Sequence, residues 1–205
     1  MKKRWMSILL VAIVSVSALI LGACSKEQAA QSGQESAPSP SVSGVSGTSE
    51  DTNAGPFDAL KNFKAADLDG NTVTQDIFTG YEMTMVNIWA TFCGPCINEM
   101  PELSQLKKIY ADKGVNVVGI VVDITDSSGN VTSDGFALAK DIVSKTGADY
   151  THIIPSSDLD ALMNSVTVVP TTVFVDSEGN VVDEEYLGAL DLENWSRVID
   201  YLLEQ

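Results

Sequence analysis

Cys93 and Cys96 enclose Gly94-Pro95, directly after an apolar run that includes Trp89 and directly before a helix-like stretch. A cysteine at the start of a helix meets unpaired backbone N–H groups and the positive end of the helix dipole, which stabilise its thiolate. The thiolate is the form that attacks a disulfide, and two intervening residues let the second thiol close the ring and expel the partner. The spacing therefore predicts thiol–disulfide exchange through a redox-active Cys93–Cys96 disulfide.

Two other uses of this cysteine pair are half of a zinc site and a purely structural disulfide. A structural zinc needs four Cys or His ligands, and the chain beyond residue 24 offers only Cys93, Cys96 and His152. We therefore expect no metal and no cofactor. His152 is the single histidine, on an apolar segment, and is interpreted as a packing or surface residue. The position of the pair at a strand-to-helix junction favours the redox interpretation.

The N-terminus indicates export. Residues 2–4 are basic, residues 8–21 are apolar but short for a membrane span, and small residues follow, so residues 1–23 are expected to be a signal peptide. The segment 21–24, Leu-Gly-Ala-Cys, resembles the bacterial lipobox, in which Cys24 would be acylated. An ordinary signal peptide with a chance cysteine is the alternative. The cysteine count favours the lipobox, because acylation of Cys24 would leave two thiols, Cys93 and Cys96, which can pair with each other.

A tether and one globular domain are expected after this signal. Residues 24–56 are rich in Ser, Gly, Gln, Pro and Ala and lack the large apolar side chains of a core, which predicts disorder behind the acylated cysteine. Residues 57–205 have a length that suits a single domain. Acyl chains would hold this domain at the extracytoplasmic face of the cell membrane, outside the glutathione pool.

The chain is strongly acidic, with a formal net charge of −16. Loss of residues 1–23 would reduce the 12 basic residues to 9 and leave all 28 acidic ones, for a charge of −19. Such a charge repels phosphate backbones, so nucleic acid is not expected as a partner. Solubility near an anionic surface accounts for it.

Alternating strand and helix patterns indicate an α/β domain with a mixed sheet and helices on both faces. The first two strands form a predicted hairpin, and residues 123–154 add a crossover unit. We expect strands at 63–68, 72–74, 84–89, 115–122, 151–154, 171–176 and 181–187, and helices at 93–110, 135–146, 158–164 and 192–203.

Two separated motifs carry a family resemblance. Residues 89–96 read Trp-Ala-Thr-Phe-Cys-Gly-Pro-Cys with Glu-Met-Pro at 99–101, and residues 169–172 read Val-Pro-Thr-Thr. This combination resembles the TlpA/ResA-like branch of membrane-tethered thiol–disulfide oxidoreductases, over about residue 57 to the C-terminus. The resemblance implies a thioredoxin-like fold, here with an N-terminal β-hairpin and an inserted crossover unit.

The resemblance also implies roles for individual residues. Cys93 matches the exposed attacking cysteine and Cys96 the buried resolving one. Pro170 matches a proline that is cis in this fold, and the backbone of Val169 before it would pair with a substrate strand. Gly94, Pro95 and Trp89 complete the expected substrate-binding face, although burial of Trp89 in the core is the alternative.

Thioredoxin has a buried Asp where this chain has Asn87, which cannot ionise. In the TlpA/ResA-like branch this position is also Asn, and a Glu three residues after the second cysteine is proposed to take its proton. Glu99 has that place here, one helical turn from Cys96. Partial burial would raise its pKa toward that of a useful base. A solvated helix glutamate is the alternative.

Gly-Pro between the cysteines is the dipeptide of reducing thioredoxin, which favours a reductase. By resemblance, a CcdA-type membrane thiol carrier would supply electrons to exported protein disulfides, with apocytochrome c and methionine sulfoxide reductases as client types. We expect a monomer. One alternative is an oxidase of secreted thiols. Another is a Sco-type copper chaperone, whose family uses a CxxxC pair and a distant histidine.

Overall fold

The computed structural model describes residues 55–205. The expected signal peptide at residues 1–23, the acylation site Cys24 and nearly all of the tether at 24–56 lie outside the described residues. The first described element is a short 3-10 helix, η1, over Pro56–Lys61.

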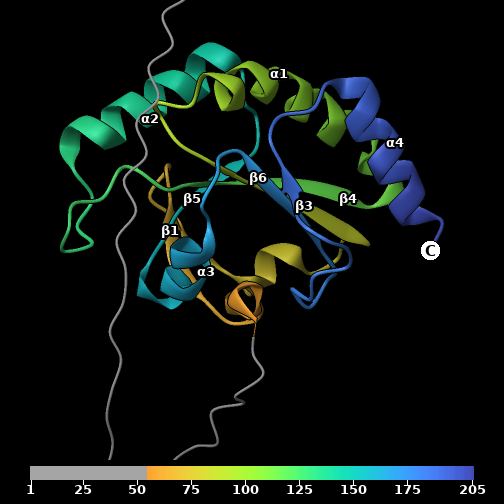
Figure 1. Ribbon diagram of the computed structural model, residues 1–205, viewed down its shortest axis with the longest axis horizontal. Helices are drawn as coiled ribbons and strands as arrows, with labels where there is room; N and C mark the ends of the chain where they lie inside the picture. Colours follow the sequence, from red (N-terminus) through yellow and green to blue (C-terminus); the bar gives the residue numbers. More distant parts are fainter. Residues whose placement is uncertain (1–54) are drawn as a thin grey trace, which may run out of the picture. The chain divides into compact units, whose positions relative to one another are not determined.

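Seven strands form one mixed sheet in the order β2-β1-β5-β4-β3-β6-β7 (Figure 1). The three central strands β3, β4 and β5 run parallel, and the strands on either side of them pair antiparallel. The strands are β1 (Lys64–Asp67), β2 (Thr72–Thr74), β3 (Met83–Trp89), β4 (Val115–Val121), β5 (Thr151–Ile154), β6 (Thr171–Val175) and β7 (Tyr186–Leu187).

Helices cover both faces of this sheet, and Figure 1 shows α1, α2 and α4 on one face with α3 on the other. The longest helix, α1, packs against both α2 and α4. The α-helices are α1 (Gly94–Ile109), α2 (Ser133–Thr146), α3 (Asp160–Ser165) and α4 (Leu192–Leu203), and the further 3-10 turns are η2 (Gln75–Phe78), η3 (Ala111–Lys113) and η4 (Ser157–Leu159). The predicted α/β class with a flanked mixed sheet is confirmed.

Strand β3 shows how the two faces are filled. All seven of its residues are buried, because helices or turns cover both sides of the sheet. Met85 and Trp89 pack into the core beneath α1, α2 and α4, whereas Val86 and Ile88 pack into the second core beneath η1 and α3. Since side chains alternate along a strand, Asn87 falls on the α1 face. That alternation aims the amide at the redox helix.

The predicted N-terminal hairpin, the crossover through α2 to β5 and the closing helix α4 are all confirmed. The last hairpin is shorter than predicted. Within the segment 181–187, where a strand was expected, only an isolated bridge from Val181 to Val175 and the two-residue strand β7 at the sheet edge are present. Three consecutive acidic residues at 183–185 interrupt it, and Asp183 turns back to accept a hydrogen bond from the Tyr186 hydroxyl.

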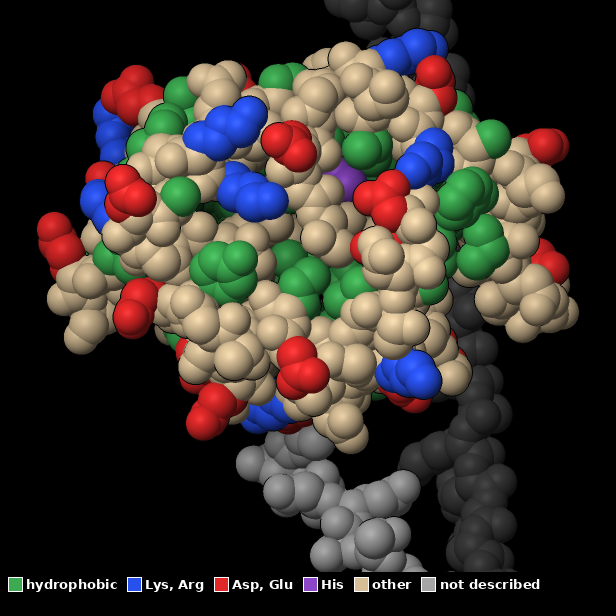
Figure 2. Space-filling model, turned by 180° about the vertical axis from the view of Figure 1, so that it is seen from behind, with side chains coloured by type: hydrophobic (Ala, Val, Ile, Leu, Met, Phe, Trp, Pro, Cys, Tyr) green, Lys and Arg blue, Asp and Glu red, His purple; other side chains and the backbone are tan. Residues whose placement is uncertain are grey.

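The described surface is rich in acidic side chains, with lysines interspersed among them on the face shown in Figure 2. Most of the lysines pair with a nearby aspartate, as Lys113 does with Asp200 at 2.8 Å. Within residues 55–205, no helix has the length and apolar character needed to cross a bilayer.

Candidate active site

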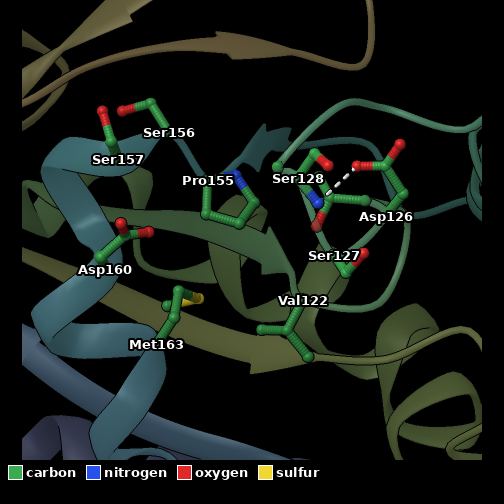
Figure 3. A pocket seen from close by; sticks show the side chains of 11 residues that line it. Val122, Asp126, Ser127, Ser128, Pro155, Ser156, Ser157, Asp160 and Met163 are labelled. Atoms are coloured by element: carbon green, nitrogen blue, oxygen red, sulfur yellow. Dashed lines mark hydrogen bonds between the residues drawn. The ribbon is translucent and has the colours of Figure 1, made fainter.

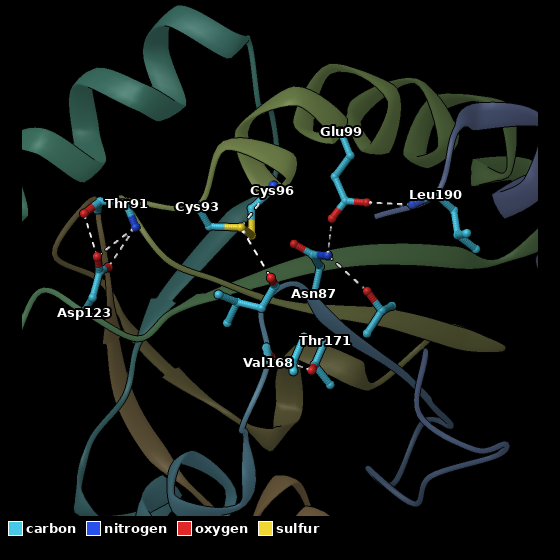
Figure 4. Close-up of a disulfide and its surroundings, with 11 residues drawn as sticks. Asn87, Thr91, Cys93, Cys96, Glu99, Asp123, Val168, Thr171 and Leu190 are labelled. Atoms are coloured by element: carbon cyan, nitrogen blue, oxygen red, sulfur yellow. Dashed lines mark hydrogen bonds between the residues drawn. A yellow bond between two sulfur atoms is a disulfide. The ribbon is translucent and has the colours of Figure 1, made fainter. Parts of the chain in front are cut away.

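Cys93 and Cys96 are joined in a disulfide at the N-terminus of α1 (Figure 4). Cys93 is the N-cap residue of the helix, and its Sγ accepts a hydrogen bond from the backbone N–H of Cys96 at 3.2 Å. Pro95 lies in the first turn, where its missing N–H costs nothing. The predicted meeting of the first sulfur with a free helix N–H is confirmed, and this contact favours the Cys93 thiolate after reduction.

The two sulfurs differ in access. The exposed fraction is 5% for Cys93 and 0% for Cys96, while Gly94 and Pro95 between them are exposed. A partner can therefore approach only the Cys93 side, across the Gly94-Pro95 turn. This asymmetry is the one needed for an attacking and a resolving cysteine.

The loop before β6 lies against the disulfide. The Val169–Pro170 peptide bond is cis, and the carbonyl oxygen of Val169 lies 3.5 Å from Cys93 Sγ. Val169 is half-buried and Pro170 is buried. Two segments that are 76 residues apart in the sequence are thus brought into contact at the attacking sulfur.

Glu99 is only 3% exposed, which excludes the alternative of a solvated helix glutamate. Its Oε1 accepts a hydrogen bond from Asn87 Nδ2 at 2.9 Å. Its Oε2 accepts from the backbone N–H of Leu190 at 3.3 Å and from Trp195 Nε1 at 3.4 Å. Figure 4 shows the carboxylate facing Asn87 and Leu190 below the helix that carries both cysteines.

Burial raises the pKa of Glu99 above that of an ordinary glutamate. The hydrogen bonds from Asn87, Trp195 and Leu190 oppose this by favouring the charged form, and burial outweighs them. A buried carboxylate that three donors support in its charged form, and whose pKa is raised, is a better proton acceptor than an ordinary glutamate. Such groups cluster at functional sites.

Asn87 links this carboxylate to the sheet. Its Nδ2 donates to Glu99 and also to Thr172 Oγ1 on β6 at 3.0 Å, while its buried Oδ1 has no partner among the described residues. Since an amide cannot ionise, Asn87 supplies a fixed dipole, and the ionisable group of the site is Glu99.

A second carboxylate, that of Asp123, binds the turn that precedes the disulfide. Both Asp123 oxygens accept from the backbone N–H of Thr91 at 2.9 Å, and Oδ2 also accepts from the Thr91 hydroxyl at 2.6 Å. Asp123 follows β4 and Thr91 follows β3, so the bond ties the ends of two parallel strands. Sequence reasoning missed this role, and nothing in the pattern around Asp123 signals it.

Trp89 does not belong to the substrate-binding face, contrary to one expectation. Its side chain is fully buried, and its indole N–H donates to His152 Nδ1 at 3.2 Å. His152 is itself 3% exposed, and its Nε2 contacts the Ala148 carbonyl oxygen at 3.3 Å. Both rings are therefore buried in the core. This agrees with the alternative given for Trp89 and with the interpretation of His152 as a packing residue.

The exposed aromatic side chain of the motif is Phe92, which is 78% accessible. It borders a hollow of about 180 Å³ with Val122, Met163, Val168 and other residues of the loop that ends at Val169. Phe92 and Val168 are thus exposed apolar side chains that line this hollow.

Comparison with known proteins shows the family of this chain. The Redoxin family profile matches residues 54–196. Thiol-disulfide oxidoreductase ResA of Bacillus thuringiensis (strain Al Hakam) is 28% identical over 123 residues, covering 60% of this chain and 65% of that protein. The ResA of Oceanobacillus iheyensis is 29% identical over 140 residues, covering 66% and 67%. The chain thus spans slightly less than two thirds of the length of the Bacillus thuringiensis ResA.

Among solved structures, a thiol:disulfide interchange protein of the thioredoxin family from Chlorobium tepidum superposes with a TM-score of 0.57. It is 24% identical and covers 69% of this chain and 93% of that one. These values show a shared thioredoxin-like fold, as expected from the two motifs.

Proposed function

Because this chain belongs to the Redoxin family and is a ResA-like member of the thioredoxin superfamily, we propose that it is a thiol–disulfide oxidoreductase working as a protein-disulfide reductase. The observation that carries the proposal is the asymmetric disulfide at the α1 N-terminus: Cys93 keeps 5% of its surface exposed, Cys96 has none, and the buried Glu99 follows one turn along the same helix. The disulfide is the oxidised end state of such a cycle.

The first half of the reaction begins with reduced Cys93. Its thiolate attacks one sulfur of the client disulfide, the client S–S bond breaks, and the other client sulfur leaves as a thiolate that takes a proton from water. The product is a mixed disulfide between Cys93 and the client. The backbone N–H of Cys96 stabilises the attacking thiolate.

The second half is performed by Cys96. Its thiol loses a proton, the resulting thiolate attacks Cys93 Sγ, and the client is released as a second thiol. Two electrons have then passed from the cysteine pair to the client. Glu99 is the proton acceptor in this step, because it lies one turn along α1 from Cys96 and its raised pKa suits it to take a proton.

Val169, Pro170, Gly94 and Pro95 form the face that a client chain meets. Gly94 and Pro95 are exposed between the two cysteines, Val169 presents its carbonyl oxygen to Cys93 Sγ, and the buried Pro170 fixes the cis bond that follows Val169. The exposed aromatic side chain of this face is Phe92 rather than Trp89.

The proposed direction of electron flow, partners and location rest on sequence features. Gly-Pro between the cysteines favours reduction of clients, and a CcdA-type membrane carrier would restore the thiols. Exported apocytochrome c or methionine sulfoxide reductases are the proposed client types. Acylated Cys24 would hold the monomer at the outer face of the membrane.

The copper-chaperone alternative loses support from the geometry of His152. Its Nδ1 accepts from Trp89 and its Nε2 contacts a carbonyl oxygen, inside the core. A ligand for copper would have to leave both contacts.

Trapping with cysteine variants tests the exchange mechanism. In the full chain, Cys96→Ser should accumulate a mixed disulfide with a disulfide-bonded client, visible on a non-reducing gel, because no resolving thiol remains. Cys93→Ser should form none, since its remaining thiol is enclosed. Equal trapping by the two variants would refute the assigned order of attack.

A further inference from the structure

A second and larger hollow, of about 700 Å³, lies at the carboxyl ends of β4 and β5. Figure 3 shows the loop after β4, with Asp126, Ser127 and Ser128, on one side and Ser156, Ser157, Asp160 and Met163 on the other. Val122 and Pro155 line it as well. In sheets with parallel central strands, ligands bind at the carboxyl edge of those strands. The disulfide follows β3 at this same edge.

The larger hollow adjoins the smaller one beside the disulfide. Val122 and Met163 line both this hollow and the smaller one bordered by Phe92 and Val169. The Val169 carbonyl oxygen in turn lies 3.5 Å from Cys93 Sγ. An extended client chain whose cysteine reaches Cys93 can therefore cross the apolar side chains of the smaller hollow. It would enter the larger hollow within a few residues, at about 3.3 Å per residue.

The two hollows differ in chemistry. The side chains of the smaller one carry no charge, whereas the larger one has two carboxylates, Asp126 and Asp160, among serine hydroxyls. Backbone N–H groups of Asn130 and Ser128 lower the pKa of Asp126, so it stays charged. Asp160 is exposed at the start of α3. No Lys, Arg or His of residues 55–205 lines either hollow.

We propose that these adjoining hollows are a specificity site for the client polypeptide, which selects an apolar residue next to the client cysteine and a Lys or Arg farther along the same strand. The apolar residue packs against Phe92, Val168 and Met163, and the cation lies between Asp126 and Asp160. Because the larger hollow is negatively charged, its complementary occupant is a basic segment of the client. This inference rests on the proposed function and adds the sequence preference of its clients.

A peptide series tests it with the reduced full-length chain. Each peptide has one cysteine in a mixed disulfide with 5-thio-2-nitrobenzoate, a leucine beside it, and a single Lys or Glu moved through positions two to six on either side. Cys93 attacks the peptide sulfur, the coloured nitrothiobenzoate leaves, and Cys96 then displaces the peptide thiol as the protein disulfide forms. The rate constant is measured at low ionic strength from the release of the coloured nitrothiobenzoate.

At one or two positions we expect Lys to react about three- to fivefold faster than Glu, as suits a partly exposed ion pair. Asp160→Asn should reduce this ratio toward one, and Asp160→Lys should invert it. Asp112→Asn removes the same charge from η3, outside both hollows, and should leave the ratio intact. Added salt should weaken the preference.

Three results would overturn the inference: a Lys preference independent of position, one that Asp160→Asn and Asp112→Asn reduce equally, or no preference. The first two would show steering by net charge alone. Rapid exchange without any preference would leave the proposed function standing, whereas a chain that never releases peptide and never closes Cys93–Cys96 would refute both.

Discussion

The indole N–H of Trp195 donates a hydrogen bond to Glu99 Oε2 across 3.4 Å, joining residues 96 positions apart in the chain. Leu190, in the segment that enters α4, donates its backbone N–H to the same oxygen at 3.3 Å. Helix α4 and the segment that enters it therefore contribute two of the three donors around the carboxylate that we propose as the proton acceptor. Residues far from the cysteine motif thus set the protonation of the site.

Replacing Glu99 by Gln should slow the resolving step on the order of 10²-fold, as expected for loss of a general base. In the wild-type protein this rate should fall as pH drops through the raised pKa of Glu99, because the protonated carboxyl cannot accept a proton. Glu99→Gln should lack that decrease. Stopped-flow measurement of client release against pH checks it, with Glu204→Gln at the end of α4 as control. An unchanged pH profile would remove Glu99 from the mechanism.

Trp195→Phe should shift the same pH profile to higher pH. The ring still fills the core, but the charged form of Glu99 loses one donor, so its pKa rises further. Trp89→Phe is the matched control, because it removes an indole N–H that bonds His152 rather than Glu99. NMR titration of the Glu99 carboxyl carbon measures the pKa directly. A shift of equal size in the two variants would mean that the Trp195 bond is not responsible.

Acid should weaken the fold through His152. Burial lowers its folded pKa to about 4 from an ordinary 6.5, so between these values the unfolded chain binds more protons and stability falls as pH falls. The lost free energy of unfolding between pH 7 and pH 5 should be about 2 kcal/mol. Glu99, whose folded pKa is raised, changes stability in the opposite sense.

Urea unfolding at the two pH values measures this difference, and His152→Gln separates the contributions. Glutamine cannot ionise, so the variant should lose much less stability on going to pH 5 than the wild-type chain. An equal loss in both proteins would assign the acid sensitivity to other groups.

Gly119→Ala should destabilise the domain by about 1–3 kcal/mol, the usual cost of an added methyl group in a packed core. A Cβ at this position would lie 2.5 Å from His152 Nδ1 and 3.2 Å from Trp89 Nε1, and so would force the two rings apart. In a His152→Ala background the same change should cost less. A double-mutant cycle by thermal unfolding checks this, and additive losses would argue against the contact.

Local patterns were enough to place most elements. The strand at 151–154 and the helix at 192–203 have the expected limits, because hydrophobic periodicity and end signals agree there. The edge strand at 181–187 was overestimated, since periodicity does not report that acidic residues turn away from the ladder. Only the family resemblance predicted the cis bond at Val169–Pro170, because composition and periodicity do not report the isomer of an X-Pro bond.

The candidate site was predictable where its residues lie close together in the chain. Cys93, Cys96 and Glu99 lie within the first turns of one helix, where their spacing and the family resemblance placed them together. The partners of Glu99 on β3 and α4, and the bond from Thr91 to Asp123, join segments that meet only through the topology of the sheet. Trp89 could not be assigned from its neighbours, because an aromatic side chain next to a redox motif suits both a contact face and a core.

The reduction potential of the Cys93–Cys96 pair tests the central claim most directly. The full chain would be equilibrated against defined ratios of reduced and oxidised dithiothreitol or glutathione, and the thiol fraction read by alkylation and mass shift. A reductase with the Gly-Pro dipeptide should give a value near thioredoxin's, about −270 mV. A value near that of the strong oxidant DsbA, about −120 mV, would contradict the account and make the protein an oxidase of secreted thiols.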